Sequence, residues 1–146
     1  PGRRLVCVFG TGSDKDQPGL LRAICSQADR VLLVQASHGR AATVDSLRAH
    51  VPEGRSGVVS VDTPAVQQAL SAVLSSPASS EAGTVVVAFG SFYVASAARA
   101  FLAERMPGLF RPDDWAFQCD ETDHDARTAP LLLSAIGLKH AWRKAR

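Results

Sequence analysis

Cysteines, aromatic residues and long apolar runs are all scarce in this sequence. Its three cysteines are odd in number and none belongs to a CxxC pair, so neither a disulfide framework nor a structural zinc site is indicated. No apolar stretch approaches the roughly 20 residues needed to cross a bilayer, and the first residues lead into a strand-like run instead of a signal peptide. We therefore expect an intracellular protein with no membrane partner.

Net charge is also small. Lys and Arg number 16 against 14 Asp and Glu residues, and the resulting net charge of +2 is too low to indicate a nucleic-acid partner. Hydrophobic residues make up 46% of the 146 residues and charged residues 21%, as in ordinary globular proteins, so we expect one main folded domain. The absence of an initial methionine indicates a piece excised from a longer protein.

Four short apolar runs rich in valine predict β-strands. Each is too short for most helices and is apolar throughout instead of alternating, as strands are when helices cover both faces of a parallel sheet. Segments of helical character lie between and after them. The predicted strands are residues 5–9, 31–34, 58–61 and 85–89, and the predicted helices are residues 17–27, 41–50, 64–74 and 92–104.

This alternation predicts an α/β fold with a Rossmann-like, mainly parallel sheet flanked by helices. Met106, Pro107 and Gly108 should end the last helix, because proline lacks the N–H donor that a helix needs. We assign residues 1–106 to the main domain and residues 107–146 to a C-terminal extension. Within that extension, residues 130–142 either form a helix packed on the domain or need the remainder of a parent protein.

Ligands of an open parallel sheet bind beyond the carboxyl ends of its strands, where helix N-termini point into a shared crevice. The predicted loops at these positions are residues 10–16, 35–40, 62–64 and 90–91. The first and the last carry the most informative residue types, so the candidate site is sought there.

The loop at residues 10–16 combines two glycines with Lys15 and the carboxylates of Asp14 and Asp16. Lys15 offers a mobile positive charge to an anion, and Asp16 can cap the following helix. The alternative interpretation is a solvated turn with a capping Asp and an exposed Lys. The spacing matches neither GxGxxG nor GxxxxGK[ST], so neither a dinucleotide fingerprint nor a Walker A loop is present.

Gly90, Ser91, Phe92 and Tyr93 follow the last predicted strand. Ser91 can cap the next helix and present its hydroxyl, together with nearby backbone N–H groups, to a carboxylate or phosphate. A helix cap without a ligand fits the same residues equally well.

Two other groups of polar residues are assigned no chemistry. His38 is a lone histidine in a polar loop, for which a solvated side chain is favoured over a catalytic one. The acidic residues at 120–125 lack the spacing of a Ca²⁺-binding loop, so no metal site is predicted.

Taken together, the two loops resemble a known family. Ser13-Asp14-Lys15-Asp16 after one strand and Gly90-Ser91-Phe92-Tyr93-Val94 after the last are similar to the DKD and GSLYL signatures of the C-terminal domain of folylpolyglutamate synthase and dihydrofolate synthase. The resemblance covers residues 4–103. This family belongs to the Mur ligase superfamily, whose members join an amino acid to a carboxylate through an acyl phosphate made from ATP.

The resemblance implies a ligase that adds L-glutamate to the γ-carboxylate of a folate. It also implies that Lys15 binds a carboxylate of the incoming glutamate and that Ser91 hydrogen-bonds to it from the facing loop. Asp14, Asp16 and Tyr93 would help to shape the pocket. No catalytic residue is expected in this chain.

The sequence departs from the family in what it lacks. The P-loop, Mg²⁺ ligands and folate pocket of the family lie in an N-terminal ATPase domain, and neither that domain nor the DGAHN-like segment after it is present. ATP and Mg would therefore bind mainly outside this chain, with the ATPase domain as its partner, and the chain alone is expected to have no ligase activity. Two alternatives stay open, namely a dihydrofolate synthase and a noncatalytic α/β binding module.

Overall fold

The computed structural model describes residues 3–60, 64–76 and 83–110. Most of the predicted C-terminal extension, including the acidic residues at 120–125 and the apolar segment at 130–142, lies outside the described residues. The chain divides into two units, Pro1–Ala98 and Arg99–Arg146. The first unit contains all four strands of the sheet.

The sheet has four strands: β1 (Arg4–Phe9), β2 (Arg30–Leu33), β3 (Val59–Ser60) and β4 (Thr84–Phe89). Their order is β3-β2-β1-β4, and all three neighbouring pairs are parallel. Val8 of β1 lies opposite Leu32 of β2 on one side and Ala88 of β4 on the other. The chain therefore winds outward from β1 in one direction and then returns to pair β4 with its other edge.

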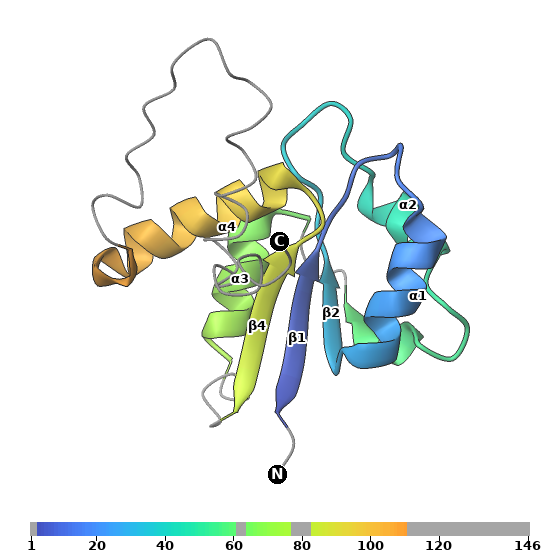
Figure 1. Cartoon of the computed structure of the whole chain (residues 1–146), viewed down its shortest axis with the longest axis horizontal. Helices are drawn as coiled ribbons and strands as arrows, with labels where there is room; N and C mark the ends of the chain where they lie inside the picture. Colours follow the sequence, from blue (N-terminus) through green and yellow to red (C-terminus); the bar gives the residue numbers. More distant parts are fainter. Residues whose placement is uncertain (1–2, 61–63, 77–82, 111–146) are drawn as a thin grey trace, which may run out of the picture. The chain divides into compact units, whose positions relative to one another are not determined.

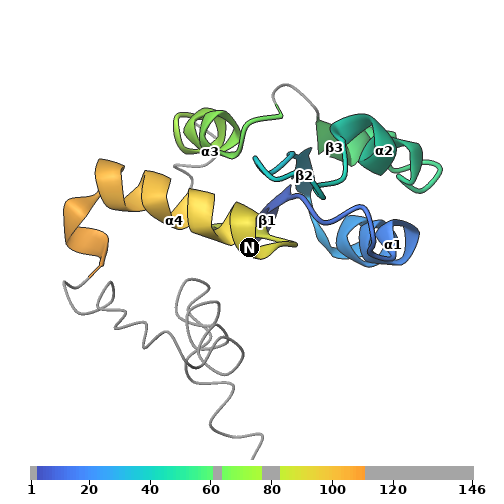
Figure 2. The ribbon, with the colours of Figure 1, turned by 90° about the horizontal axis from the view of Figure 1, so that it is seen from above.

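Helices cover both faces of this sheet (Figure 1). They are α1 (Gln17–Gln27), α2 (Val44–Ala49), α3 (Val66–Leu74) and the part of α4 (Phe92–Arg105) that precedes Arg99, with a short 3-10 turn at Ser56–Val58. Figure 2 shows α1 and α2 on one side of the strands, with α3 and the start of α4 on the other. The predicted α/β fold with a parallel sheet is confirmed.

β1 is apolar throughout because both of its faces are buried. Cys7 and Phe9 point to the face where α1 packs, and they share one core cluster with Leu21 of that helix. Val6 and Val8 point to the opposite face and are equally buried. Cys7 is thus a small buried hydrophobe, and burial raises the pKa of its thiol, which keeps it protonated and unreactive.

Several element boundaries differ from the prediction by one to three residues, and two of these differences have a clear local cause. The second helix begins at Val44 instead of residue 41, because Thr43 is its N-cap and its hydroxyl accepts a hydrogen bond from the Ser46 N–H at 3.1 Å. β3 begins at Val59 instead of residue 58, because the 3-10 turn at Ser56–Val58 occupies the start of the predicted strand, and residue 61 lies outside the described residues.

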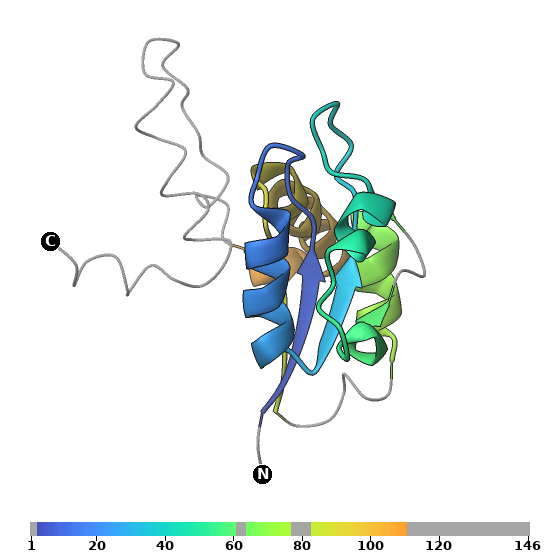
Figure 3. The same ribbon diagram turned by 90° about the vertical axis from the view of Figure 1, so that its right-hand side faces the viewer.

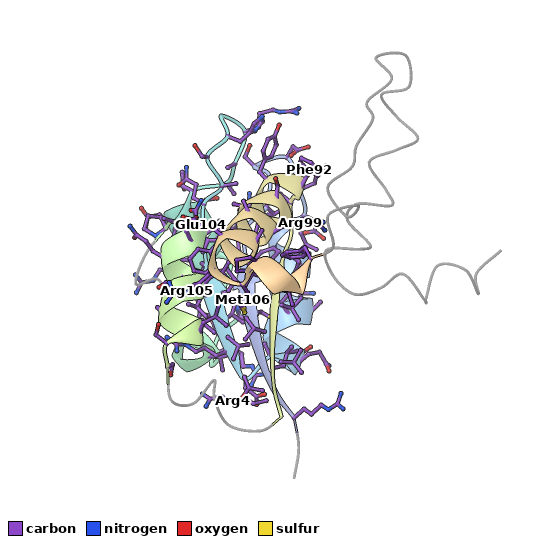
Figure 4. All side chains as sticks on the ribbon, turned by 90° about the vertical axis from the view of Figure 1, so that its left-hand side faces the viewer. Arg4, Phe92, Arg99, Glu104, Arg105 and Met106 are labelled. Atoms are coloured by element: carbon purple, nitrogen blue, oxygen red, sulfur yellow. The ribbon has the colours of Figure 1, made fainter. Side chains whose placement is uncertain are left out.

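The described part of the second unit contains the end of α4 and the turn at Pro107–Leu109. The helix ends at Arg105, as the Met106-Pro107-Gly108 sequence predicts. Within this unit, the Arg99 guanidinium lies 4.6 Å from the centre of the Phe110 ring (Figure 4 labels Arg99). In the described ranges of both units, no helix is both long enough and apolar enough to cross a membrane.

Candidate functional site

A cavity of about 270 Å³ lies at the carboxyl edge of the sheet. The loops after β1, β2 and β4 all contribute residues to its lining. The strand order reverses between β1 and β4, and such a reversal leaves an open crevice because successive crossovers run in opposite directions. The topology therefore predicts a ligand at the place where the cavity is found.

The loops after β1 and β2 are tied to one another by backbone contacts. Gly12 forms an isolated antiparallel bridge with Ala41, the Ser13 N–H donates to the Arg40 carbonyl at 2.9 Å, and the Ala42 N–H donates to the Thr11 carbonyl at 2.9 Å. Figure 3 shows the two loops rising side by side beyond the strands. These bonds hold two walls of the cavity together.

The first loop ends in a capped helix. The Lys15 N–H donates to the Gly12 carbonyl at 3.3 Å and closes a turn, and Asp16 then caps α1 by accepting from the Gly19 N–H at 3.0 Å. Pro18 stands in the first turn, where its missing N–H has no cost. The predicted cap and turn are confirmed, and together they fix the backbone on both sides of Lys15.

Charge in the cavity is mainly positive. The Lys15 ammonium lies 3.1 Å from the Asp14 carboxylate, and both side chains are more than half exposed, at 60% and 62%. The hydrogen bond and charge of Lys15 hold the pKa of Asp14 below its usual range, and Arg40 adds a smaller effect in the same direction. Asp14 therefore stays ionised near neutral pH beside two cations, Lys15 and Arg40, that line the same cavity.

The third loop has a backbone that only glycine adopts easily. Gly90 has a φ of +109°, which carries the chain out of β4 and into α4. The Ser91 hydroxyl oxygen accepts from the Val94 N–H at 3.2 Å, so Ser91 caps α4 as predicted. Since this oxygen is an acceptor toward the helix, its O–H hydrogen remains a donor for a group in the cavity.

His38, in the loop after β2, differs from its predicted state. The sequence favoured a solvated side chain, but the imidazole is half-buried and stacks on the Tyr93 ring, with centroids 4.1 Å apart and planes 20° apart. Tyr93 belongs to the first turn of α4, so this contact joins the loop after β2 to the far wall of the cavity. No single loop shows such a pair, which is why sequence reasoning missed it.

Four of the five predicted site residues line the cavity, namely Asp14, Lys15, Ser91 and Tyr93. Asp16 is not among the lining residues, and its carboxylate is engaged by the α1 cap. Arg40 lines the cavity although it was given no role. The signal for it was its place in a loop at the carboxyl end of a strand, where a cation is as informative as Lys15.

Among the described residues, His, Cys, Asp and Glu side chains form no group of three or more that could hold a metal ion. The predicted acidic run at 120–125 lies outside those residues.

Among known proteins, matches to this chain are found only among solved structures. No family model matches the chain, and neither does any curated protein. Two solved structures match: Mycobacterium tuberculosis folylpolyglutamate synthase complexed with ADP and AMPPCP, at 28% identity and a TM-score of 0.57, and the same enzyme complexed with ADP, at 30% identity and a TM-score of 0.54. Each match covers 68% of this chain.

The chain spans only about a quarter of the proteins it matches, 24% and 23% of their lengths. The likeness therefore concerns one part of a larger enzyme, and that part is an α/β unit with a parallel sheet. In both fold and sequence this chain is similar to folylpolyglutamate synthase, which confirms the resemblance seen in its motifs and is consistent with the C-terminal domain of a Mur ligase.

Proposed function

We propose that this chain is the glutamate-binding, C-terminal domain of an ATP-dependent folylpolyglutamate synthase, which adds L-glutamate to a folate through an acyl phosphate. The observation that carries the proposal is the cavity at the strand reversal, which receives Lys15 from one loop and Ser91 from another. The likeness to the mycobacterial enzyme supports the same function.

The charges of the cavity complement those of glutamate. L-glutamate carries two carboxylates and one ammonium, and the lining offers two cations, Lys15 and Arg40, and one carboxylate, Asp14. In this proposal each cation takes a carboxylate, and Asp14 takes the ammonium. Lys15 can leave Asp14 for a glutamate carboxylate at little cost, because its ion pair with Asp14 is exposed and such pairs contribute little to stability.

Ser91 supplies a neutral hydrogen bond and a helix terminus. Its hydroxyl hydrogen is available for a glutamate carboxylate while its oxygen continues to accept from Val94. The positive end of the α4 dipole lies at the same residue and favours an anion there. Tyr93 forms part of the wall beside it, whereas Asp16 keeps the backbone of the Lys15 loop in place through its cap.

ATP and Mg²⁺ fit the described residues poorly. The loop at residues 10–16 lacks the GxxxxGK[ST] spacing that cradles phosphates, and the described side chains form no metal-binding group. We therefore assign both to an N-terminal ATPase domain of the same protein, where ATP would activate the folate carboxylate. On this proposal the chain alone has no ligase activity, and glutamate and folate meet only when the two domains are joined.

The role of the two loops is tested by removing one glutamate-binding side chain from each. Lys15→Ala and Ser91→Ala are each expected to weaken L-glutamate binding about three- to tenfold, since each removes a hydrogen bond to a carboxylate. Dissociation constants come from an NMR titration of the 146-residue chain.

Arg48→Ala is the matched control, because Arg48 is an exposed cation of α2 that does not line the cavity. It removes the same charge as Lys15→Ala and should leave the affinity unchanged. Equal weakening by Arg48→Ala and Lys15→Ala would show that glutamate senses only the net charge, and it would refute the proposed site.

A further inference from the structure

The loop after β2 is organised around His38. Its N–H donates to the Ala36 carbonyl at 2.8 Å, and its carbonyl accepts from the Ala41 N–H at 2.9 Å. Its imidazole Nδ1 accepts from the Arg40 N–H at 3.2 Å. Three hydrogen bonds to one residue make a tight turn. One of the three joins the His38 side chain to the backbone of Arg40.

The bond to Arg40 requires one form of the imidazole. A nitrogen that accepts a hydrogen bond carries no proton, so this contact needs Nδ1 without a hydrogen. The contact runs from a side chain to the backbone N–H two residues later, as in the turns that Asn and Asp make. Asparagine can therefore replace the acceptor of His38 but cannot replace its aromatic ring.

The aromatic ring that stacks on His38 belongs to α4. Tyr93 stacks on His38, and its ring also meets Phe92 edge-on, with centroids 5.9 Å apart. Phe92 and Tyr93 are 43% and 45% exposed, so these rings stand at the cavity wall instead of in the core. The stack thus fixes the loop after β2 on the helix that presents Ser91.

We propose that His38 is a positioning residue that holds Arg40 for the side-chain carboxylate of the incoming amino acid and so selects L-glutamate over its neutral analogue L-glutamine. This inference rests on the function proposed above. Arg40 has an exposed, long side chain, and ordering such a side chain on a ligand costs much entropy. The hydrogen bond to Nδ1 fixes the backbone of Arg40, so the Arg40 side chain samples fewer conformations before the ligand binds.

The test measures the preference for L-glutamate over L-glutamine, as the ratio of the two dissociation constants, in the 146-residue chain. His38→Phe keeps a ring for the stack and loses the acceptor, and we expect the preference to fall about threefold or more. His38→Asn keeps the acceptor and should retain most of the preference. His50→Phe, at the exposed C-cap of α2, is the control and should not change it.

A double-mutant cycle with Arg40→Ala separates positioning from any independent effect. If His38 acts through Arg40, His38→Phe should lower the preference no further once Arg40 is removed. His38→Ala serves in the same cycle should His38→Phe fail to fold, as judged from its amide spectrum.

A preference that His38→Phe leaves unchanged, or that falls additively in the double variant, would overturn the role of His38 while the glutamate site stands. Absence of L-glutamate binding by the unaltered chain would instead overturn the proposed function, and the role of His38 with it.

Discussion

Replacement of Gly90 by alanine is expected to lower the free energy of unfolding by about 2–6 kcal/mol. Its φ of +109° is strained for any residue with a Cβ, which costs about 1–3 kcal/mol. A Cβ there would also lie 2.6 Å from both the Gly10 carbonyl oxygen and the Phe9 ring. Both neighbours are buried, so they cannot move aside cheaply, and overpacking adds about 1–3 kcal/mol.

Chemical denaturation of Gly90→Ala and of Gly57→Ala measures this effect. A Cβ at Gly57 would have no atom within 4 Å, and the φ of Gly57 is not positive, so its replacement should leave the stability unchanged or slightly raised. Similar midpoints for the two variants would show that the backbone does not turn at Gly90 as described. The position of Ser91, and with it one wall of the cavity, would then lose its basis.

Replacement of Leu21 by alanine is expected to cost about 2–5 kcal/mol. Leu21 has no exposed surface and packs in the core cluster between α1 and the sheet, so its loss leaves a cavity that the surroundings fill only in part. The measurement is again the free energy of unfolding from denaturant titration.

Leu20→Ala provides the internal control, because Leu20 is the adjacent residue of the same helix and is 38% exposed. Both variants make the same change in helix propensity, so the difference between them reports burial alone. We expect Leu20→Ala to cost no more than about 1 kcal/mol. A Leu20 effect as large as that of Leu21 would mean that α1 turns a different face to the sheet.

The strands were predictable because their burial determines which residue types they contain. A strand such as β1 that is covered on both faces must be apolar at every position, and its valines favour the extended backbone. The start of α2 was less predictable. Residues 41 and 42 have helical composition, but they pair with the loop after β1, and this contact is between residues about 30 positions apart.

The site was predictable in position and only partly in its residues. Lys15 and Ser91 follow strands that the topology brings together, so strand order alone places them at one edge. Asp16 follows the same strand, but its side chain caps α1, and a capping carboxylate and a ligand-binding one look alike in sequence. The His38–Tyr93 stack joins a loop residue to a helix residue 55 positions later in the chain, and no local pattern indicates it.

We propose above that the cavity between the three loops is a glutamate site. The most direct measurement follows the backbone amides of the unaltered chain by NMR during a titration with L-glutamate to about 50 mM, where a site with a Kd of about 10 mM would be mostly occupied. We expect saturable shifts confined to residues 11–15, 36–41 and 90–93. Amides that do not move, or saturable shifts that gather away from these loops, would contradict it.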